Sequence, residues 1–267
     1  MERIGLIAGN RKFPLLFCAA AKRRGYAVIA VALKGDTAPR INKLADKVYW
    51  LGLAEFNRIS GIFNSAGVKK IVMAGQISPA RLFSREVKNS PDIQQILSSI
   101  RNKKADTIFG AIADKLTAAG LELLNSSTFV EDFLVKKGPL TRRQPDQATW
   151  DDIHFGFDLA KSIGALDIGQ TVAVKDKAIL AVEALEGTDN LIRRSGKIAR
   201  GGITVIKVAK PEQDMRFDIP VIGLKTIQNL IKAGAKCLAV EADKTLFIDR
   251  DAALRLADKK GISIVGV

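Results

Sequence analysis

The sequence predicts an α/β protein of two domains: an N-terminal Rossmann-like domain with a mostly parallel sheet and helices, and a C-terminal mixed α/β domain. Three observations predict this fold class. Short apolar segments alternate with helical patterns in the first half of the chain, as in βαβ units. Residues 136–146 are basic and contain two prolines, which is typical of a linker. The 267 residues suffice for two modest domains, predicted at 1–135 and 147–267.

The N-terminal half alternates buried strands with helices. Apolar runs without internal charge indicate strands that are covered on both faces, as in parallel sheets. Gly25 and Gly67 end helical patterns, and Ser90-Pro91-Asp92 is a helix start with proline in the first turn. The predicted order is strand 3–8, helix 13–24, strands 27–33 and 47–51, helix 54–66, strand 69–74, helical pieces within 79–119, strand 121–124 and an extended segment 129–135.

The C-terminal half opens with a helix and mixes hairpin and crossover patterns. Lys175-Asp176-Lys177 separates two short apolar runs, which indicates a hairpin. The predicted order is helix 148–163, strands 172–174 and 179–182, an arginine-rich helix after Asp189, strand 203–208, a polar loop 209–218, strand 219–222, helix 224–234, strands 238–240 and 246–248, helix 250–260 and strand 262–265.

The composition is that of a soluble globular protein, with 47% hydrophobic and 26% charged residues. No run of about 18 uncharged apolar residues is present, so no membrane-spanning helix is expected. The apolar run after Met1-Glu2-Arg3 is too short for a signal peptide. These features predict a cytoplasmic protein.

Cysteine and histidine are scarce, which narrows the chemistry. Cys18 and Cys237 are the only cysteines and His154 is the only histidine, too few for a thiolate zinc site. No nucleophile elbow surrounds His154, so a histidine-dependent triad is not expected. We predict both thiols in the core and His154 in a helix without a chemical role.

The formal net charge of +14 attracts anionic partners over long range. Nucleic acid, a phosphorylated small molecule and an anionic membrane surface all qualify. Only 6% of the residues are aromatic, and no helix-turn-helix, RNP or zinc-finger pattern is present. No nucleic-acid partner is therefore expected.

Two glycine turns follow predicted parallel strands, Gly9-Asn10 and Gly75-Gln76. Open α/β sheets bind ligands beyond the carboxyl ends of their strands, so a ligand at this edge is expected. The spacing of the glycines in the first turn is not G-x-G-x-x-G, so the sequence does not favour a dinucleotide cofactor. The simpler alternative is that both glycines only form tight turns.

Three carboxylates, Glu183, Glu186 and Asp189, lie within seven residues around Gly187-Thr188. Clustered carboxylates repel one another unless a cation or basic partners offset the charge. Magnesium prefers oxygen ligands and often takes one or two carboxylates plus substrate phosphates. The alternatives are that Asp189 is a helix N-cap and that Glu183 is a surface strand residue.

The segment from Lys207 to Asp218 is dense in both signs of charge and follows a buried strand. Lys207, Lys210 and Arg216 can hold phosphate oxygens. Asp214 and Asp218 can bind a metal or orient a water for attack. The alternative is a solvated loop without function.

Several of these motifs together resemble one family, the LpxI-type UDP-2,3-diacylglucosamine pyrophosphatases. They are Ile4–Asn10 with Phe13-Pro14-Leu15, Val72–Gln76, Val182–Asp189, Lys207–Asp218, Ala239–Ala242 and Ile248–Arg250, in the family's order. The resemblance covers essentially the whole chain, and the two long motifs, Val182–Asp189 and Lys207–Asp218, are specific. One departure is Arg11-Lys12, where the family pattern has a smaller residue or glycine.

The resemblance implies a reaction and a setting. Water and a divalent cation, Mg²⁺ or another such as Mn²⁺, split UDP-2,3-diacylglucosamine into 2,3-diacylglucosamine 1-phosphate and UMP during lipid A synthesis. The substrate lies between two domains, and the enzyme contacts the cytoplasmic face of the inner membrane peripherally. The oligomeric state, a homodimer included, stays open.

The resemblance and the residue chemistry together give a set of expected site residues. The catalytic residues are Asp214, ranked first, with Asp218, Lys207 and Arg216; substrate contacts are Gly9, Asn10, Gly75, Gln76, Gly187, Thr188, Lys210 and Gln213; metal ligands are Glu183, Glu186, Asp189 and Asp214. Two alternatives remain: an oxidoreductase that binds NAD or a nucleotide sugar, and a lipid or nucleotide carrier without turnover.

Overall fold

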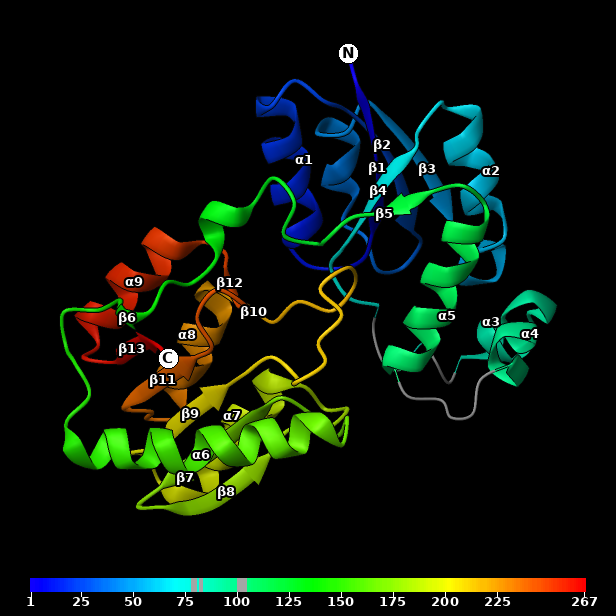
Figure 1. Cartoon of the computed structure of the whole chain (residues 1–267). Coiled ribbons are helices and arrows are strands. Elements are labelled where there is room, and N and C mark those ends of the chain that lie inside the picture. The colour runs from blue at the N-terminus through cyan, green and yellow to red at the C-terminus, as the bar shows by residue number, and fades with distance from the viewer. Residues whose placement is uncertain (78–80, 82–83, 100–104) are drawn as a thin grey trace. The chain divides into compact units, whose positions relative to one another are not determined.

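The computed structural model describes residues 1–77, 81, 84–99 and 105–267 (Figure 1). Within this part the chain divides into two compact units. The N-terminal unit contains Met1–Glu131 and Asp214–Asp218, and the C-terminal unit contains Asp132–Gln213 and Ile219–Val267. A short segment of the C-terminal half of the sequence therefore packs with the N-terminal unit.

The predicted domain boundary at 136–146 stays a prediction, although the structure adds detail there. Gly138–Pro139 of that segment forms the short strand β6, which pairs antiparallel with the C-terminal strand β13 (Ser263–Gly266). Arg142 N also donates to Asp258 Oδ1 at 2.8 Å. The proline-rich segment is thus bound to the C-terminal unit.

The N-terminal unit is built on a five-stranded sheet in the order β3-β2-β1-β4-β5. Every pairing in it is parallel, which confirms the predicted Rossmann-like fold. The strands are β1 Arg3–Ala8, β2 Ala27–Leu33, β3 Lys47–Leu51, β4 Lys70–Ala74 and β5 Glu122–Leu123.

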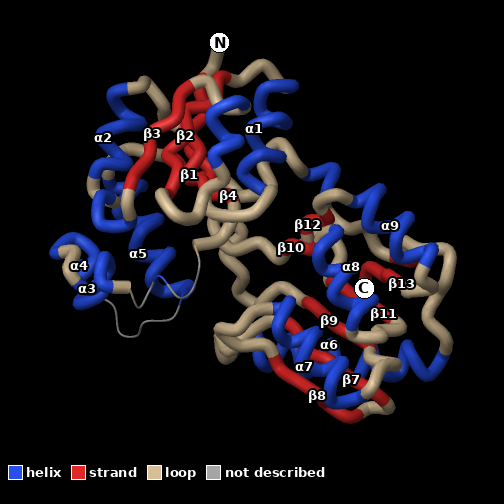
Figure 2. Tube along the Cα trace, turned by 180° about the vertical axis from the view of Figure 1, so that it is seen from behind, coloured by secondary structure: helices blue, strands red, loops and turns tan. Residues whose placement is uncertain are grey.

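Helices cover both faces of this sheet, because its strands are apolar on both sides. Helix α1 (Phe13–Arg23) lies on one face, and α2 (Arg58–Ser65) and α5 (Ala105–Ala118) lie on the other (Figure 2). Phe63 of α2 and Leu116 of α5 belong to one core cluster with strand residues Ile7, Val31, Ile71 and Met73. Short helical segments η1 (Pro39–Lys43), η2 (Leu53–Glu55), α3 (Arg85–Lys88) and α4 (Pro91–Ser99) complete the unit.

The predicted helical pieces within 79–119 are confirmed where the structure describes them, and residues 78–80, 82–83 and 100–104 lie outside the described part. The predicted extended segment 129–135 is wrong. A 3₁₀ turn, η4 (Glu131–Phe133), occupies its middle. Phe129 takes a left-handed backbone with φ 70° and packs its ring on Tyr26, 4.7 Å between centroids. Val130 and Val135 are buried, but the chain between them does not form a strand.

The C-terminal unit contains a mixed six-stranded sheet in the order β6-β13-β11-β9-β7-β8 and a two-stranded sheet, β10-β12. Strands β9, β11 and β13 are parallel, whereas β7 pairs antiparallel with both neighbours. The strands are β7 Thr171–Lys175, β8 Ala178–Val182, β9 Thr204–Lys207, β10 Val221–Ile222, β11 Cys237–Val240 and β12 Leu246–Phe247. The predicted mixed α/β domain is confirmed.

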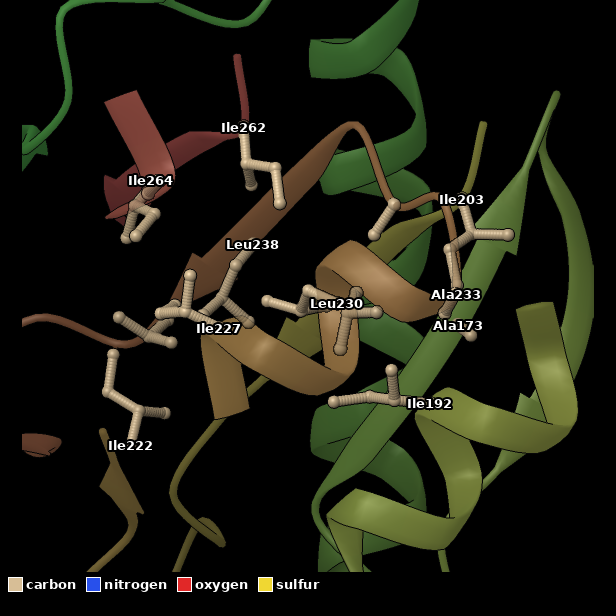
Figure 3. Close-up of a cluster of buried hydrophobic side chains, with 14 of the residues drawn as sticks. Ala173, Ile192, Ile203, Ile222, Ile227, Leu230, Ala233, Leu238, Ile262 and Ile264 are labelled. Carbon is tan, nitrogen blue, oxygen red and sulfur yellow. The ribbon is translucent and has the colours of Figure 1, made fainter. Parts of the chain in front are cut away.

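Helices on two faces close the core of this unit. Helices α7 (Thr188–Ala199), α8 (Leu224–Lys232) and α9 (Arg250–Lys259) share one cluster, in which Ile192, Leu230 and Leu238 meet (Figure 3). Helix α6 (Gln147–Ala165) packs Ile153 and Ala160 on the opposite face. His154 lies in helix α6, as predicted. Its ring stacks on that of Trp150, with 5.7 Å between the ring centroids.

No helix in the described ranges combines the length and the apolar character that a membrane crossing needs. Cys18 and Cys237 are both buried, as predicted.

Candidate active site

The two glycine turns of the N-terminal unit pack directly against each other. Gly9 N donates to Ala74 O at 2.8 Å, and Asn10 N donates to Gln76 O at 2.7 Å. A Cβ on Gly75 would lie 2.5 Å from Asn10 O, and its φ of +86° also favours glycine. Both turns thus need glycine for close backbone approach at the carboxyl edge of the sheet.

Asn10 and Arg11 give this turn two unusual features. Asn10 Oδ1 is buried and has no hydrogen-bond partner among the described residues. Buried acceptors are normally paired, so this atom is a candidate for contact with a ligand donor. Arg11 has φ 67°, a left-handed conformation that glycine adopts without strain. The departure from the family pattern at this position therefore falls on a backbone geometry suited to a glycine.

The segment Asp214–Asp218 is held at the end of β4 by Ser126. Ser126 N donates to Met215 O at 2.7 Å. The Ser126 hydroxyl donates to Met73 O at 2.7 Å and lies 3.0 Å from Arg216 O. Since β4 also accepts the hydrogen bond from Gly9, the Gly9 turn and the Asp214 segment are fixed by the last two residues of one strand.

Asp214 and Arg216 form an ion pair with two parallel contacts. Arg216 Nη2 lies 2.7 Å from Asp214 Oδ2, and Arg216 Nε lies 3.0 Å from Asp214 Oδ1. These hydrogen bonds from the guanidinium hold the pKa of Asp214 below its ordinary value, and they raise the pKa of Arg216. Asp218 N donates to Asp214 O at 3.0 Å, which closes the turn. The carboxylate of Asp214 is therefore ionised and fixed in direction.

A buried polar cluster lies at the end of β9 in the C-terminal unit. Lys207, the last residue of β9, is 4% exposed and donates from Nζ to Thr188 Oγ1 at 2.9 Å. Thr188 Oγ1 donates to Glu183 Oε1 at 2.8 Å. Glu183 Oε2 is buried without a hydrogen bond, and Lys207 Nζ lies 3.9 Å from it. Four sequence-predicted residues, with Gly187 as the N-cap of α7, are thus brought together.

Lys210 and Gln213 form a turn after β9. Lys210 N donates to Gln213 Oε1 at 2.8 Å, and Gln213 N donates to Lys210 O at 3.2 Å. The Lys210 ammonium forms an ion pair with Asp167. Lys210 and Gln213 therefore fix the turn of the backbone that comes directly before Asp214.

The three carboxylates of the 183–189 segment do not converge. Glu186 is paired with Arg194 at 2.8 Å, and Asp189 contacts Asn229 Nδ2 at 2.8 Å and Lys225 Nζ at 3.2 Å. Glu183 faces Lys207 instead. In the described ranges no three His, Cys, Asp or Glu side chains gather as a metal site.

Three of the four predicted metal ligands, Glu183, Glu186 and Asp189, are thus each balanced by a basic partner of their own and do not form a metal cage together. The fourth, Asp214, belongs to the N-terminal unit, so the complete predicted set stays a prediction. We assign no chemical step to a metal. The two alternative interpretations of this segment are wrong: Gly187 rather than Asp189 is the helix N-cap, and Glu183 is buried rather than on the surface.

The structure adds Ser126, Lys161 and Glu241, which sequence reasoning did not assign to the site. Glu241 accepts hydrogen bonds from Lys161 Nζ at 3.0 Å and Ala209 N at 2.8 Å. Burial raises the pKa of Glu241, but its hydrogen bonds from Lys161, Ala209 and Lys244 outweigh this and hold it below its ordinary value. Its position directly after a buried parallel strand was a usable signal, whereas a single serine such as Ser126 offers none.

Comparison with known proteins gives matches over both halves of the chain. The family model described as the LpxI N-terminal domain matches residues 3–133, and the one described as the LpxI C-terminal domain matches residues 136–265. A relative from Caulobacter vibrioides bears the name UDP-2,3-diacylglucosamine pyrophosphatase LpxI. It is 29% identical over 279 residues, which cover 100% of this chain and 98% of the relative.

Two solved structures resemble the chain distantly. The biotin carboxylase subunit of pyruvate carboxylase is 13% identical with a TM-score of 0.30, covering 75% of this chain and 41% of that one. N5-carboxyaminoimidazole ribonucleotide synthetase from Thermotoga maritima is 17% identical with a TM-score of 0.25, covering 70% and 43%. The chain thus spans about two fifths of the length of these proteins. At these TM-scores the two likenesses say nothing about the function of the chain.

The family matches agree with the motifs, because the N-terminal match contains both glycine turns and the C-terminal match contains the segments around Glu183 and Asp214. With two family domains in the expected order and a relative aligned over the full length, the chain belongs to the LpxI family.

Proposed function

We propose that this protein hydrolyses the pyrophosphate of UDP-2,3-diacylglucosamine, releasing UMP and 2,3-diacylglucosamine 1-phosphate for lipid A biosynthesis. Its family membership and the name of its Caulobacter relative support the substrate. The observation that carries the chemistry is the ionised Asp214, held by Arg216 at the carboxyl edge of a parallel sheet. Ligands of open α/β sheets bind at that edge.

Asp214 is proposed to orient the attacking water by accepting a hydrogen bond from it. An efficient general base has a pKa near the working pH, and the Arg216 hydrogen bonds move the pKa of Asp214 in the opposite direction. The Asp214 carboxylate is therefore better suited to positioning the water and to electrostatic stabilisation than to accepting a proton from the water.

The cationic side chains are proposed to balance the charge of the diphosphate. Charge builds on phosphate oxygens as the bridging bond breaks, and fixed cations in a partly buried site stabilise it. In the N-terminal unit Arg216 has this role. In the C-terminal unit Lys207 offers a buried ammonium whose direction is set by Thr188 and Glu183. Neither group requires cysteine or histidine.

The reaction is tested by incubating the purified protein with UDP-2,3-diacylglucosamine and measuring UMP release. Asp214→Asn keeps the shape of the side chain but removes its charge. We expect turnover to fall about a hundredfold or more with substrate binding retained, because the lost interaction acts mainly in the transition state. Asp251→Asn, an exposed change in α9, is the matched control.

Two results would redirect the proposal. Near-normal turnover of Asp214→Asn together with a slow Asp218→Asn variant would move the role to Asp218. No UMP release by the unmodified protein with any divalent cation would refute the reaction itself.

The expected requirement for Mg²⁺ or Mn²⁺ stays a prediction, and it is tested separately. UMP release should stop when a chelator is added and return when the metal is restored in excess. Full activity in the chelator would show that the cations of the chain suffice, in keeping with the separate basic partners of Glu186 and Asp189.

A further inference from the structure

An apolar cavity of about 300 Å³ lies within the N-terminal unit. Its floor contains residues at or near the carboxyl ends of four parallel strands: Ile7, Leu33, Leu51 and Met73. Its walls come from η2, α2, α3, α4 and α5, among them Ile93 and Ile112. Every described residue that lines the cavity belongs to this one unit.

The cavity separates two apolar clusters that do not merge. One is the main core under α2 and α5, and the other is a small cluster of Leu33, Leu53 and Val87 with Ile77 and Ile93 packed against it. Protein interiors are close-packed, and an empty apolar space of this size costs stability because its lining lacks contact partners. The fold therefore keeps a space that side chains could have filled.

Polar bonds outside the cavity hold α3, which forms part of its wall, in place. Arg81 Nη1 contacts Asp36 Oδ2 at 2.8 Å, and Arg81 Nη2 contacts Glu86 Oε2 at 2.7 Å. Glu86 also accepts a hydrogen bond from Ala54 N of η2 at 3.3 Å. The Asp36 side chain is only 2% exposed, so one end of this ion-pair cluster is buried. The cavity is thus supported from outside while its interior stays apolar.

The chemistry of the lining selects a hydrocarbon. Lys88 and Gln94 are the charged and amide side chains among the lining residues, and both are exposed. The other lining side chains are aliphatic or aromatic. A sugar or a nucleotide in such a space would lose hydrogen bonds to water without replacement, whereas an alkyl chain would not.

The cavity wall touches the Asp214–Asp218 segment. Phe109 of α5 lines the cavity, and its ring stacks on Phe217 with 5.8 Å between centroids. Phe217 follows Arg216, the partner of Asp214. An occupant of the cavity would therefore lie against the wall that supports the proposed water-binding carboxylate.

We propose that this cavity binds one fatty acyl chain of the lipid substrate, an inference that rests on the proposed function for the identity of that lipid. The acyl tail lies in the cavity, and the polar head of the molecule stays outside it. Each CH₂ group moved from water into the cavity should then tighten binding about fourfold until the space is full.

The experiment measures both binding and turnover in the full-length protein. Ile112→Trp and Ile93→Trp fill the cavity from two different helices, and Ile62→Trp is the matched control on α2, half-buried but outside the lining. Circular dichroism selects the variants that fold. Binding is read with a fluorescent polyene fatty acid, and UMP release is measured with substrates of increasing acyl length.

We expect either cavity-filling variant to weaken fatty-acid binding at least tenfold. Its kcat/KM should fall for long-chain substrate and change little for UDP-glucosamine derivatives with short acyl groups. The control should behave like the unmodified protein. Equal binding by all variants, or no fatty-acid binding by the unmodified protein, would overturn the proposal. Because the binding measurement needs no turnover, it decides the cavity's role even if no UMP is released.

Discussion

Single backbone positions set the geometry of the candidate site, and Gly75 is the clearest case. It combines a positive φ with a Cβ position only 2.5 Å from Asn10 O, so a side chain there meets backbone that cannot move aside easily. Gly25 has nearly the same φ, +82°, but nothing lies within 4 Å of its Cβ position. A comparison of Gly75 with Gly25 therefore distinguishes the effect of backbone strain from that of steric crowding.

We predict that Gly75→Ala lowers the free energy of unfolding by about 1–3 kcal/mol more than Gly25→Ala does, because crowding is added to the same strain. Urea unfolding of both variants, followed by circular dichroism, measures the difference. Equal losses would show that the Gly9 turn and the Gly75 turn can move apart.

Lys207 and Glu183 present a buried charge pair whose members depend on each other. Lys207→Met would leave Glu183 buried without its cation, and we predict a loss of about 3–5 kcal/mol in unfolding free energy. The double variant Lys207→Met with Glu183→Gln should recover much of this loss. Calorimetry compares the variants, with Lys232→Met on the exposed face of α8 as the control. A double variant as unstable as Lys207→Met would exclude the pairing as the cause.

At the scale of elements, the buried strands and most helices could be predicted because continuous apolar runs bounded by glycine leave few alternatives. The segment around Phe129 could not, because Phe129 takes a left-handed backbone conformation and packs its ring on Phe17 and Tyr26, which lie about 100 residues earlier in the sequence. Spacing in the sequence also did not show how the three carboxylates of residues 183–189 are arranged. Glu183, Glu186 and Asp189 are close in sequence, but a loop and a helix start turn them toward three different cations.

The position of a candidate residue in the fold could be predicted best where the end of a strand places it. Lys207 follows directly from the end of β9, and Gly9 and Gly75 follow from the ends of β1 and β4. The ion pair between Asp214 and Arg216 could also be predicted, because the two residues are only two positions apart in the sequence. The attachment of this segment through Ser126 depends on contacts 90 residues apart, which no local pattern records.

At the scale of the whole molecule, each unit carries one buried thiol, Cys18 in α1 and Cys237 in β11. Burial raises the pKa of each thiol to about 12. Thiolate is the reactive form, so neither cysteine should be alkylated at neutral pH until its unit opens.

We predict that mass spectrometry after alkylation at increasing urea concentrations will follow the opening of the two units separately. Coincident labelling of Cys18 and Cys237 would show a single cooperative transition, and earlier labelling of one would identify the weaker unit. Rapid labelling of either cysteine in the absence of urea would contradict its burial.

The return of Asp214–Asp218 to the N-terminal unit means that the two family domains cannot be separated cleanly at the level of the gene. A fragment ending near residue 135 would keep all five parallel strands but lose the residues that cover Phe109 and bond to Ser126. The complementary fragment would retain those residues with no sheet to receive them. Exchange of domains between relatives would therefore have to transplant these five residues together with the N-terminal half.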